Sequence, residues 1–157
     1  MELSLEICQK QEQELIFSHF YHQDAFVIGN YITKKSIQKK YPIAVVIEIN
    51  HQVIFQYIND GASLNNLEWI HKKRNVVTRF EKSSAYMTYK LEKEDMTFEQ
   101  KYGDSSQYAI TPGAFPIRVH NVGVIGTIAV SGLSSQDDHG LIIEACEYLL
   151  SSQEEEQ

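Results

Sequence analysis

The segment at 122–131, VGVIGTIAVS, restricts the fold more than any other part of the chain, because neither of its faces is polar. Successive residues of a strand point to opposite faces, and in this segment both faces consist mainly of apolar or small side chains. A strand without a polar face is covered on both sides. Glycines inside such a strand suit a bulge or the close approach of a neighbouring backbone. The segment therefore predicts a sheet that lies between two helical layers, or between a helical layer and a second subunit.

The residues that follow, SGLSSQDDHG at 131–140, fit a phosphate-binding loop, a nucleophile elbow or a plain junction between a strand and a helix. No Gly-Lys-Ser/Thr follows the glycines, which argues against a phosphate-binding loop, and their spacing does not match a dinucleotide-binding fingerprint. Asp138 and His139 are neighbours on one helix and point in different directions, which argues against a Ser-His-Asp triad. We predict a junction in which Ser135 and Asp138 form a capping box, and we predict no catalytic residue.

The rest of the chain predicts one α/β domain at 1–152, followed by an acidic, frayed tail at 153–157. A chain of 157 residues is long enough to bury its own core. Asn50-His51 separates two β-branched segments, which predicts an antiparallel hairpin. Ser63 is a candidate helix N-cap. The expected helices are 2–20, 24–40, 64–82 and 135–152, with helical or mixed structure at 83–103; the expected strands are 43–50, 52–58, 107–110, 115–119 and 122–131.

Composition argues against several classes of protein. The net charge of −7 argues against nucleic-acid binding, which needs clustered lysine and arginine. Two local basic clusters, 34–40 and 71–74, are interpreted as solvated helix faces. No apolar run is long enough to span a membrane, and the acidic start of the sequence does not resemble a signal peptide. With Cys8 and Cys146 as its two cysteines, the sequence predicts a cytoplasmic protein with reduced thiols.

Lys73 is unusual because it lies in the middle of an apolar stripe on its expected helix. Its neighbours one turn away on either side are Trp69, Ile70, Val76 and Val77. A lysine in this position extends its ammonium group to the surface, pairs with a carboxylate, or enters a pocket with a lowered pKa. The pattern does not distinguish between these three arrangements, and Arg74 lies at the edge of the same stripe.

Three histidines are candidate ligands. His139 points along the apolar stripe of the last helix, which is consistent with a half-buried, hydrogen-bonded histidine or with a ligand at the rim of a pocket. His19 and His22 are one helical turn apart, so both could face one metal ion. A catalytic zinc site needs three protein ligands, and no third ligand follows at a recognisable spacing.

Three segments resemble the heme-degrading-domain family of HbpS/GlcG-like proteins, in a branch without an assigned activity. They are WIHKKRNVVTRFEKSSAYM at 69–87, GAFPIRVHNVGVIGTIAVSGL at 113–133 and DDHGLIIEA at 137–145. The resemblance covers about residues 10–152. It implies a profilin-like α/β/α sandwich with a central antiparallel sheet, and assembly into homodimers or larger rings. It also implies heme or a corrinoid-related molecule as a ligand, with His19 or His22 as the nearest candidates to bind heme iron.

Together, these features favour an oligomeric binding or accessory protein over an enzyme. The ligand we expect is a small anion, with an anionic tetrapyrrole such as heme as one candidate. The expected binding residues are Lys73, Arg74, Phe115, Arg118 and His139. The alternative is a protein-interaction or assembly module without a small-molecule ligand, in which Lys73 forms an ion pair across a subunit interface.

Overall fold

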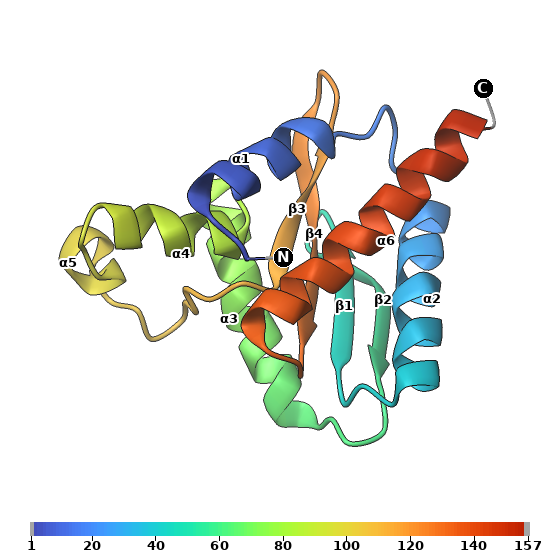
Figure 1. The fold of residues 1–157 in the computed structure, drawn as a ribbon, viewed down its shortest axis with the longest axis horizontal. Coiled ribbons are helices and arrows are strands. Elements are labelled where there is room, and N and C mark those ends of the chain that lie inside the picture. The colour runs from blue at the N-terminus through green and yellow to red at the C-terminus, as the bar shows by residue number, and fades with distance from the viewer. Residues whose placement is uncertain (1, 156–157) are drawn as a thin grey trace.

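The computed structural model describes residues 2–155. Its elements follow the order helix, helix, hairpin, three helices, hairpin, helix (Figure 1). They are α1 (Leu5–Glu14), α2 (His22–Lys39), β1 (Ala44–Ile49), β2 (Gln52–Ile58), α3 (Leu64–Phe80), α4 (Ser84–Lys93), α5 (Phe98–Tyr102), β3 (Ala114–Val119), β4 (Gly123–Ser131) and α6 (Ser135–Glu155).

The four strands form one antiparallel sheet in the order β2-β1-β4-β3. α2 and α6 pack on one face of this sheet, and α3 packs on the other (Figure 1). The predicted α/β/α sandwich with a central antiparallel sheet is therefore confirmed. α1 and α4 pack against each other beside the β3 edge, and α5 extends this side of the molecule.

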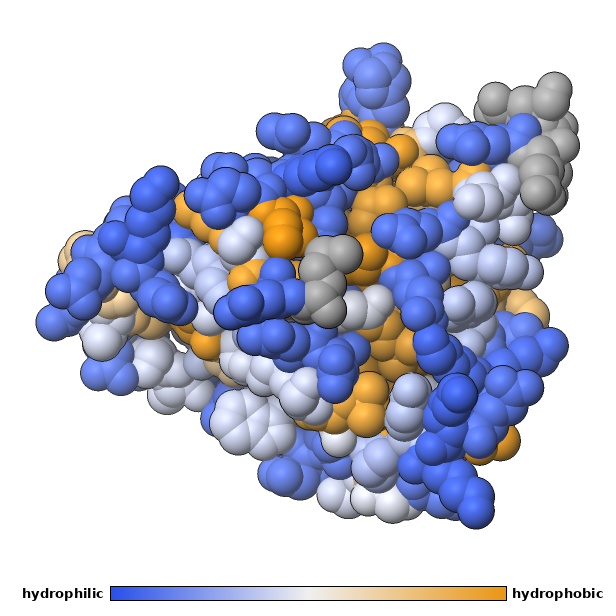
Figure 2. Space-filling view, viewed as in Figure 1, coloured by the Kyte–Doolittle hydropathy of each residue, from blue (hydrophilic) through white to orange (hydrophobic). Residues whose placement is uncertain are grey.

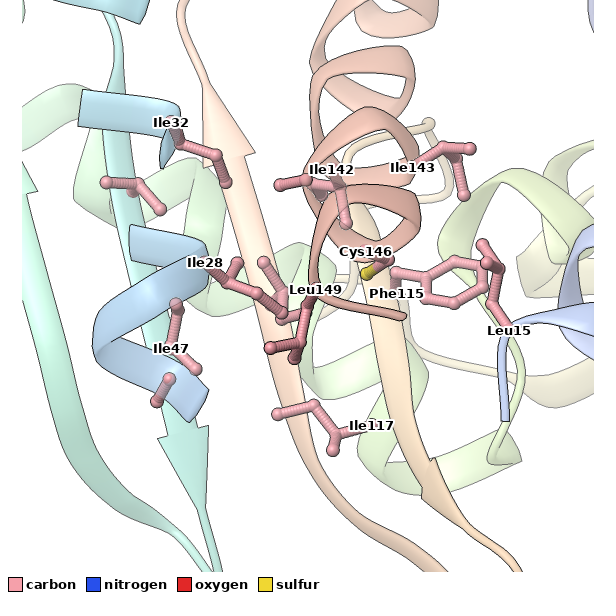
Figure 3. Packing of buried hydrophobic residues seen from close by; sticks show 14 of the residues in the cluster. Leu15, Ile28, Ile32, Ile47, Phe115, Ile117, Ile142, Ile143, Cys146 and Leu149 are labelled. Carbon is pink, nitrogen blue, oxygen red and sulfur yellow. The ribbon is translucent and has the colours of Figure 1, made fainter. Parts of the chain in front are cut away.

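The larger part of the core lies between the sheet and the helices α2 and α6. Figure 3 shows the isoleucines of α2, the apolar face of α6 and the side chains of β1 and β3 pointing toward one another. A smaller cluster on the opposite face packs α3 against the sheet, and it consists of Ala44, Val46, Ile70, Val77, Ala114 and Ala129. β1 and the second half of β4 are thus buried between helices of the same chain, as the apolar strand predicts, whereas residues 123–126 of β4 are only partly buried.

Gly126 explains why glycine occurs inside the longest strand. A Cβ atom at this position would overlap the backbone carbonyl of Glu48 on the neighbouring strand β1. This carbonyl is part of the sheet and cannot move aside without breaking it. A side chain at position 126 would therefore push β4 away from β1.

Two expected elements are wrong. The helix predicted for 2–20 ends at Glu14, and the chain then runs past β3, where Phe17 forms a parallel bridge with Val119. The strand predicted for 107–110 is a turn followed by irregular chain. This segment is held against α3 by a hydrogen bond from the Ala109 amide to the Lys72 carbonyl, and against α5 by the stacking of Tyr108 on Phe98. Tertiary contacts outweigh its strand-like composition.

The last helix runs through Glu155, three residues beyond its predicted end. The remainder of the predicted acidic tail, 156–157, lies outside the described residues. Within residues 2–155, none of the helices has the length and apolarity to cross a membrane. The face of the molecule seen in Figure 2 is mainly hydrophilic, with patches of hydrophobic side chains on either side of α6. Cys8 and Cys146 are free and buried.

Candidate functional site

A cavity of about 430 Å³ opens where α3, the end of β4 and the start of α6 meet. Trp69 forms an exposed wall, and most of the remaining lining groups are polar. The lining residues are Asn65, Asn66, Trp69, Lys73, Thr111, Ser131, Gly132, Leu133, Ser135 and Asp138. We call this space the Lys73 cavity.

Lys73 is only 3 % exposed, so it does not extend its ammonium group to the surface. Its Nζ donates to the Val130 carbonyl at 3.1 Å and to Asp138 Oδ2 at 3.3 Å. Lys73 therefore pairs with a buried carboxylate and at the same time lines a cavity.

Burial acts on both members of this pair. It lowers the pKa of Lys73 from its ordinary value, and it raises the pKa of Asp138, because removal from water disfavours each charged form. The attraction between the two charges opposes both shifts. The pair is held in place by a third contact, because the second carboxylate oxygen of Asp138 accepts a hydrogen bond from the Leu133 amide at 2.9 Å.

Gly113 makes room for the lysine head. Its φ of +133° is rarely adopted by residues with a side chain, and a Cβ atom at this position would overlap Lys73 Nζ. The glycine before β3 therefore allows the ammonium group to reach the junction between β3, β4 and α6.

The predicted capping box of Ser135 and Asp138 is wrong by one residue. Ser134 accepts a hydrogen bond from the Asp137 amide at 3.2 Å, and α6 begins at Ser135. The Asp138 side chain turns inward to Lys73 and Leu133 instead of capping the helix. Ser135 accepts a hydrogen bond from the Thr111 hydroxyl at 2.7 Å, which closes one side of the Lys73 cavity.

Neither of the two predicted arginines lines the Lys73 cavity. Arg74 Nη1 donates to both carboxylate oxygens of Glu48, at 2.9 and 3.2 Å. Arg118 donates to the Glu81 carbonyl at 2.6 Å and lies 3.7 Å from a carboxylate oxygen of Glu12. Both guanidinium groups therefore already have acceptors within the chain.

Phe115 and His139 lie in the core between the sheet and α6. His139 is 0 % exposed, its Nε2 is 2.7 Å from Gln11 Oε1, and its ring makes an edge contact with Phe115. Within the described part of the chain, its Nδ1 has no hydrogen-bond partner. Burial lowers the pKa of His139 to about 4, so the ring is neutral at physiological pH. The five predicted ligand residues are thus not brought together at one site.

His19 and His22 do not share a helix. His19 lies in the connection between α1 and α2 and stacks on Tyr21, whereas His22 is the first residue of α2 and is exposed. Among residues 2–155, no three histidine, cysteine, aspartate or glutamate side chains are grouped to hold a metal ion.

A second concave surface, which we call the α2 groove, lies between α2 and the second half of α6. It has a volume of about 530 Å³ and is lined by Phe26, Val27, Asn30, Tyr31, Lys34, Lys35, Gln38, Lys39 and Tyr148. Phe26 and Tyr148 are 60 % and 48 % exposed, so the groove offers two accessible aromatic rings. Lys35 and Tyr31 both donate hydrogen bonds to Glu144. Lys34 and Lys39 also line the groove, and they take no part in these hydrogen bonds.

The α2 groove was missed by the sequence analysis, which interpreted the basic cluster 34–40 as a solvated face. A signal was present, because Phe26, Asn30, Lys34 and Gln38 follow one another at intervals of four residues. Such a spacing places them along one face of a helix. The partner wall, Tyr148, belongs to a distant segment, and only the tertiary structure brings it beside Tyr31.

Comparison with known proteins agrees with this architecture. The family model described as "Haem degrading protein HbpS-like" matches residues 20–147. A UPF0303 protein of Serratia proteamaculans is 35 % identical over 147 residues, which cover 93 % of this chain and 91 % of the relative. The crystal structure of the Ybr137w protein has a TM-score of 0.87 at 29 % identity, covering 98 % of this chain and 91 % of the other. The structure of a PduOC:heme complex has a TM-score of 0.66 at 15 % identity, covering 82 % and 93 %.

Proposed function

The chain belongs to the HbpS-like family of haem degrading proteins, and we propose that it is a self-associating protein that binds an anionic tetrapyrrole in the α2 groove. The observation that carries this proposal is the lining of the groove, where exposed aromatic rings lie next to lysines. A related fold forms a complex with heme in PduOC, which agrees with a ligand of this class.

The chemistry of the groove fits such a ligand. A tetrapyrrole is a flat, apolar ring system with carboxylates along one edge, and it gains most of its binding energy from apolar contact. Phe26 and Tyr148 offer ring surfaces, and Lys34 and Lys39 offer positive charge for the carboxylates. When heme is bound, it supplies iron chemistry; the residues of this chain hold the ring and its carboxylates.

The α2 groove holds a porphyrin without a histidine ligand to iron. His139 has no exposed surface, and among the residues that line the groove none is a histidine. His22 is the nearest histidine in sequence, one helical turn before Phe26. We therefore expect the metal-free protoporphyrin IX to bind about as well as hemin, and the His22→Ala variant to bind both as the unchanged protein does.

Reversing two charges of the groove is expected to weaken binding. In Lys34→Glu/Lys39→Glu, two carboxylates replace the cations that face the ligand, so the dissociation constant for protoporphyrin IX should rise by about tenfold or more. Titration followed by porphyrin absorbance and fluorescence measures this change. The control is Lys10→Glu/Lys93→Glu, which changes the net charge equally at exposed positions on α1 and α4.

Saturable binding at one porphyrin per chain that weakens only in the groove variant is the expected result. Binding that does not saturate, or that weakens equally in both double variants, would contradict a specific site in the α2 groove. The second candidate function, an assembly module without a small ligand, would then be the better proposal.

Self-association is proposed through the β2 edge, and this edge also supports the second candidate function. β2 pairs with β1 on one side, and no strand of the described chain pairs with its other side. Its sequence, QVIFQYI, has neither the charged residues nor the proline that often protect a free edge, and one register irregularity at Ile54 interrupts its pairing with β1. Two copies could therefore join their sheets by antiparallel pairing of β2 with β2.

Buried, free thiols also support a reducing compartment such as the cytoplasm.

Light scattering after size exclusion tests this interface. The unchanged protein is expected to have at least twice the chain mass of 18.1 kDa. Val53→Lys/Gln56→Lys should shift it toward the monomer, because the symmetry of the pairing brings like charges together. Gln9→Lys/Gln13→Lys, with the same charge change on the exposed side of α1, should not. A monomeric unchanged protein at micromolar concentration would overturn the proposal.

A further inference from the structure

Tetrapyrrole binding at the α2 groove makes no use of the Lys73 cavity. Within the described residues, the head of Lys73 has two acceptors, Val130 O and Asp138 Oδ2, whereas a lysine ammonium has three donors. The side chain is almost completely removed from bulk water and yet lines an open cavity. A buried amine beside a buried carboxylate, both lining the same cavity, is an arrangement that can act on a bound molecule.

We infer that Lys73 is a carbonyl-reactive amine, and that its cavity admits a small hydroxylated aldehyde or ketone that Lys73 binds as an imine. This inference concerns a different part of the molecule from the α2 groove and does not depend on tetrapyrrole binding.

The lining of the cavity favours a neutral, hydroxylated ligand over an anion. The charges of Lys73 and Asp138 offset each other at 3.3 Å, so the site offers no net positive charge to a carboxylate or a phosphate. The remaining polar groups are hydroxyls and amides, among them Thr111, Ser135 and Asn65. These groups can exchange hydrogen bonds with the hydroxyls of a ligand, while Trp69 provides an apolar wall for its carbon chain.

The chemical steps balance with the two side chains alone. Asp138 takes a proton from the Lys73 ammonium, which leaves a neutral amine and a carboxylic acid. The amine nitrogen attacks the carbonyl carbon and gives a carbinolamine, with the nitrogen's proton moving to the oxygen. Asp138 then returns its proton to the carbinolamine hydroxyl, which leaves as water. The product is a protonated imine of Lys73 beside the Asp138 carboxylate, so the starting charges are restored and no oxidant or reductant is consumed.

Burial supports the first step. It lowers the pKa of Lys73 and raises the pKa of Asp138, so proton transfer from the ammonium to the carboxylate is less costly here than at the surface. An exposed lysine with a pKa of about 10.4 is less than about 0.1 % neutral at pH 7 and reacts correspondingly slowly. The neutral amine is also the form that nucleophilic lysines use in other proteins.

Reductive trapping tests the inference on the unchanged protein. Glyceraldehyde is added at about pH 7 with cyanoborohydride, which reduces an imine to a stable secondary amine, and the modified lysines are mapped by mass spectrometry. Lys73 is expected to be modified at least about tenfold faster than the surface residues Lys10 and Lys93, given their small neutral fraction. Labelling of Lys73 at the same rate as these lysines, or more slowly, would overturn the inference.

Trp69 provides a second measurement, because it is the single tryptophan of the chain and it lines the cavity. Its fluorescence is expected to change saturably with glyceraldehyde, and the change should become permanent on reduction. Because Lys72 Nζ lies 5.8 Å from the centre of the Trp69 ring, the comparison is made in a Lys72→Arg background, which should keep the permanent change. In Lys72→Arg/Lys73→Arg, which keeps both cations but cannot form an imine at either position, the permanent change should be lost. Circular dichroism checks that this variant is folded, and a permanent change that survives in the folded variant would also overturn the inference.

Discussion

Replacing Lys73 with methionine is expected to lower the free energy of unfolding by about 3–5 kcal/mol, as the loss of one partner from a buried ion pair does elsewhere. Methionine keeps much of the apolar stem, so packing changes little. The cost arises because the Asp138 carboxylate, 2 % exposed, loses the cation 3.3 Å away and remains buried. Urea unfolding followed by circular dichroism measures the difference.

A second substitution separates this cause from a loss of packing. Lys73→Met/Asp138→Asn removes both charges and keeps an oxygen that can accept from the Leu133 amide. We expect the double variant to be more stable than Lys73→Met alone by more than about 1 kcal/mol, because the stranded charge is gone. Lys93→Met, the same change at an exposed site on α4, should stay within about 0.5 kcal/mol of the unchanged protein. A Lys73→Met protein of unchanged stability would mean that Asp138 is neutral in the fold.

The sequence identified Lys73 as unusual but could not identify its partner. The apolar stripe on α3 predicted that the stem would be buried, and this needed only helical periodicity. Asp138 lies 65 residues away, and a local rule assigned it to the helix N-terminus. The carboxylate that pairs with Lys73 depends on where β4 ends and so places the start of α6 relative to α3. Helical periodicity carries no information on the relative position of two helices.

The fold itself was predictable to a greater extent. The absence of a polar face in the strand near 122–131 required cover on both sides, and the structure provides α2 and α6 on one face and α3 on the other. The errors occurred where a local pattern competed with a distant contact. Residues 107–110 have a strand-like composition, yet Ala109 bonds to α3. The helix expected for 2–20 ends before Leu15, and the chain beyond it runs beside β3, where Phe17 forms a bridge with Val119.

The predicted ligand residues share no local motif, and the structure separates them. The stripe of α6 predicts a position for His139 on that helix but says nothing about the residues that cover it. Gln11, which contacts the His139 ring, lies 128 residues away in sequence. The same limit explains why the α2 groove was missed, because one of its walls comes from α2 and the other from Tyr148 of α6.

Burial of His139 is expected to make the protein sensitive to mild acid. The folded pKa of about 4 lies below the ordinary value of 6.5, so the unfolded chain takes up the proton first as the pH falls. The stability contributed by the neutral ring is therefore complete above about pH 6.5 and is lost progressively as the pH falls toward 4. Between about pH 7.5 and pH 5, protonation of this histidine in the unfolded chain lowers the free energy of unfolding by about 2 kcal/mol.

The His139→Leu variant isolates this contribution, because every other titrating group is common to both proteins. Leucine cannot be protonated, so the unchanged protein should lose about 2 kcal/mol of stability relative to the variant as the pH falls over the same range. Urea unfolding at several pH values, followed by circular dichroism, measures it. The buried carboxyl groups of Glu12 and Asp138 cannot produce the same loss, because burial raises the pKa of each and uptake of a proton then favours the folded chain. Two parallel pH profiles would contradict the expectation and would mean that the folded protein protonates His139 as readily as the unfolded chain does.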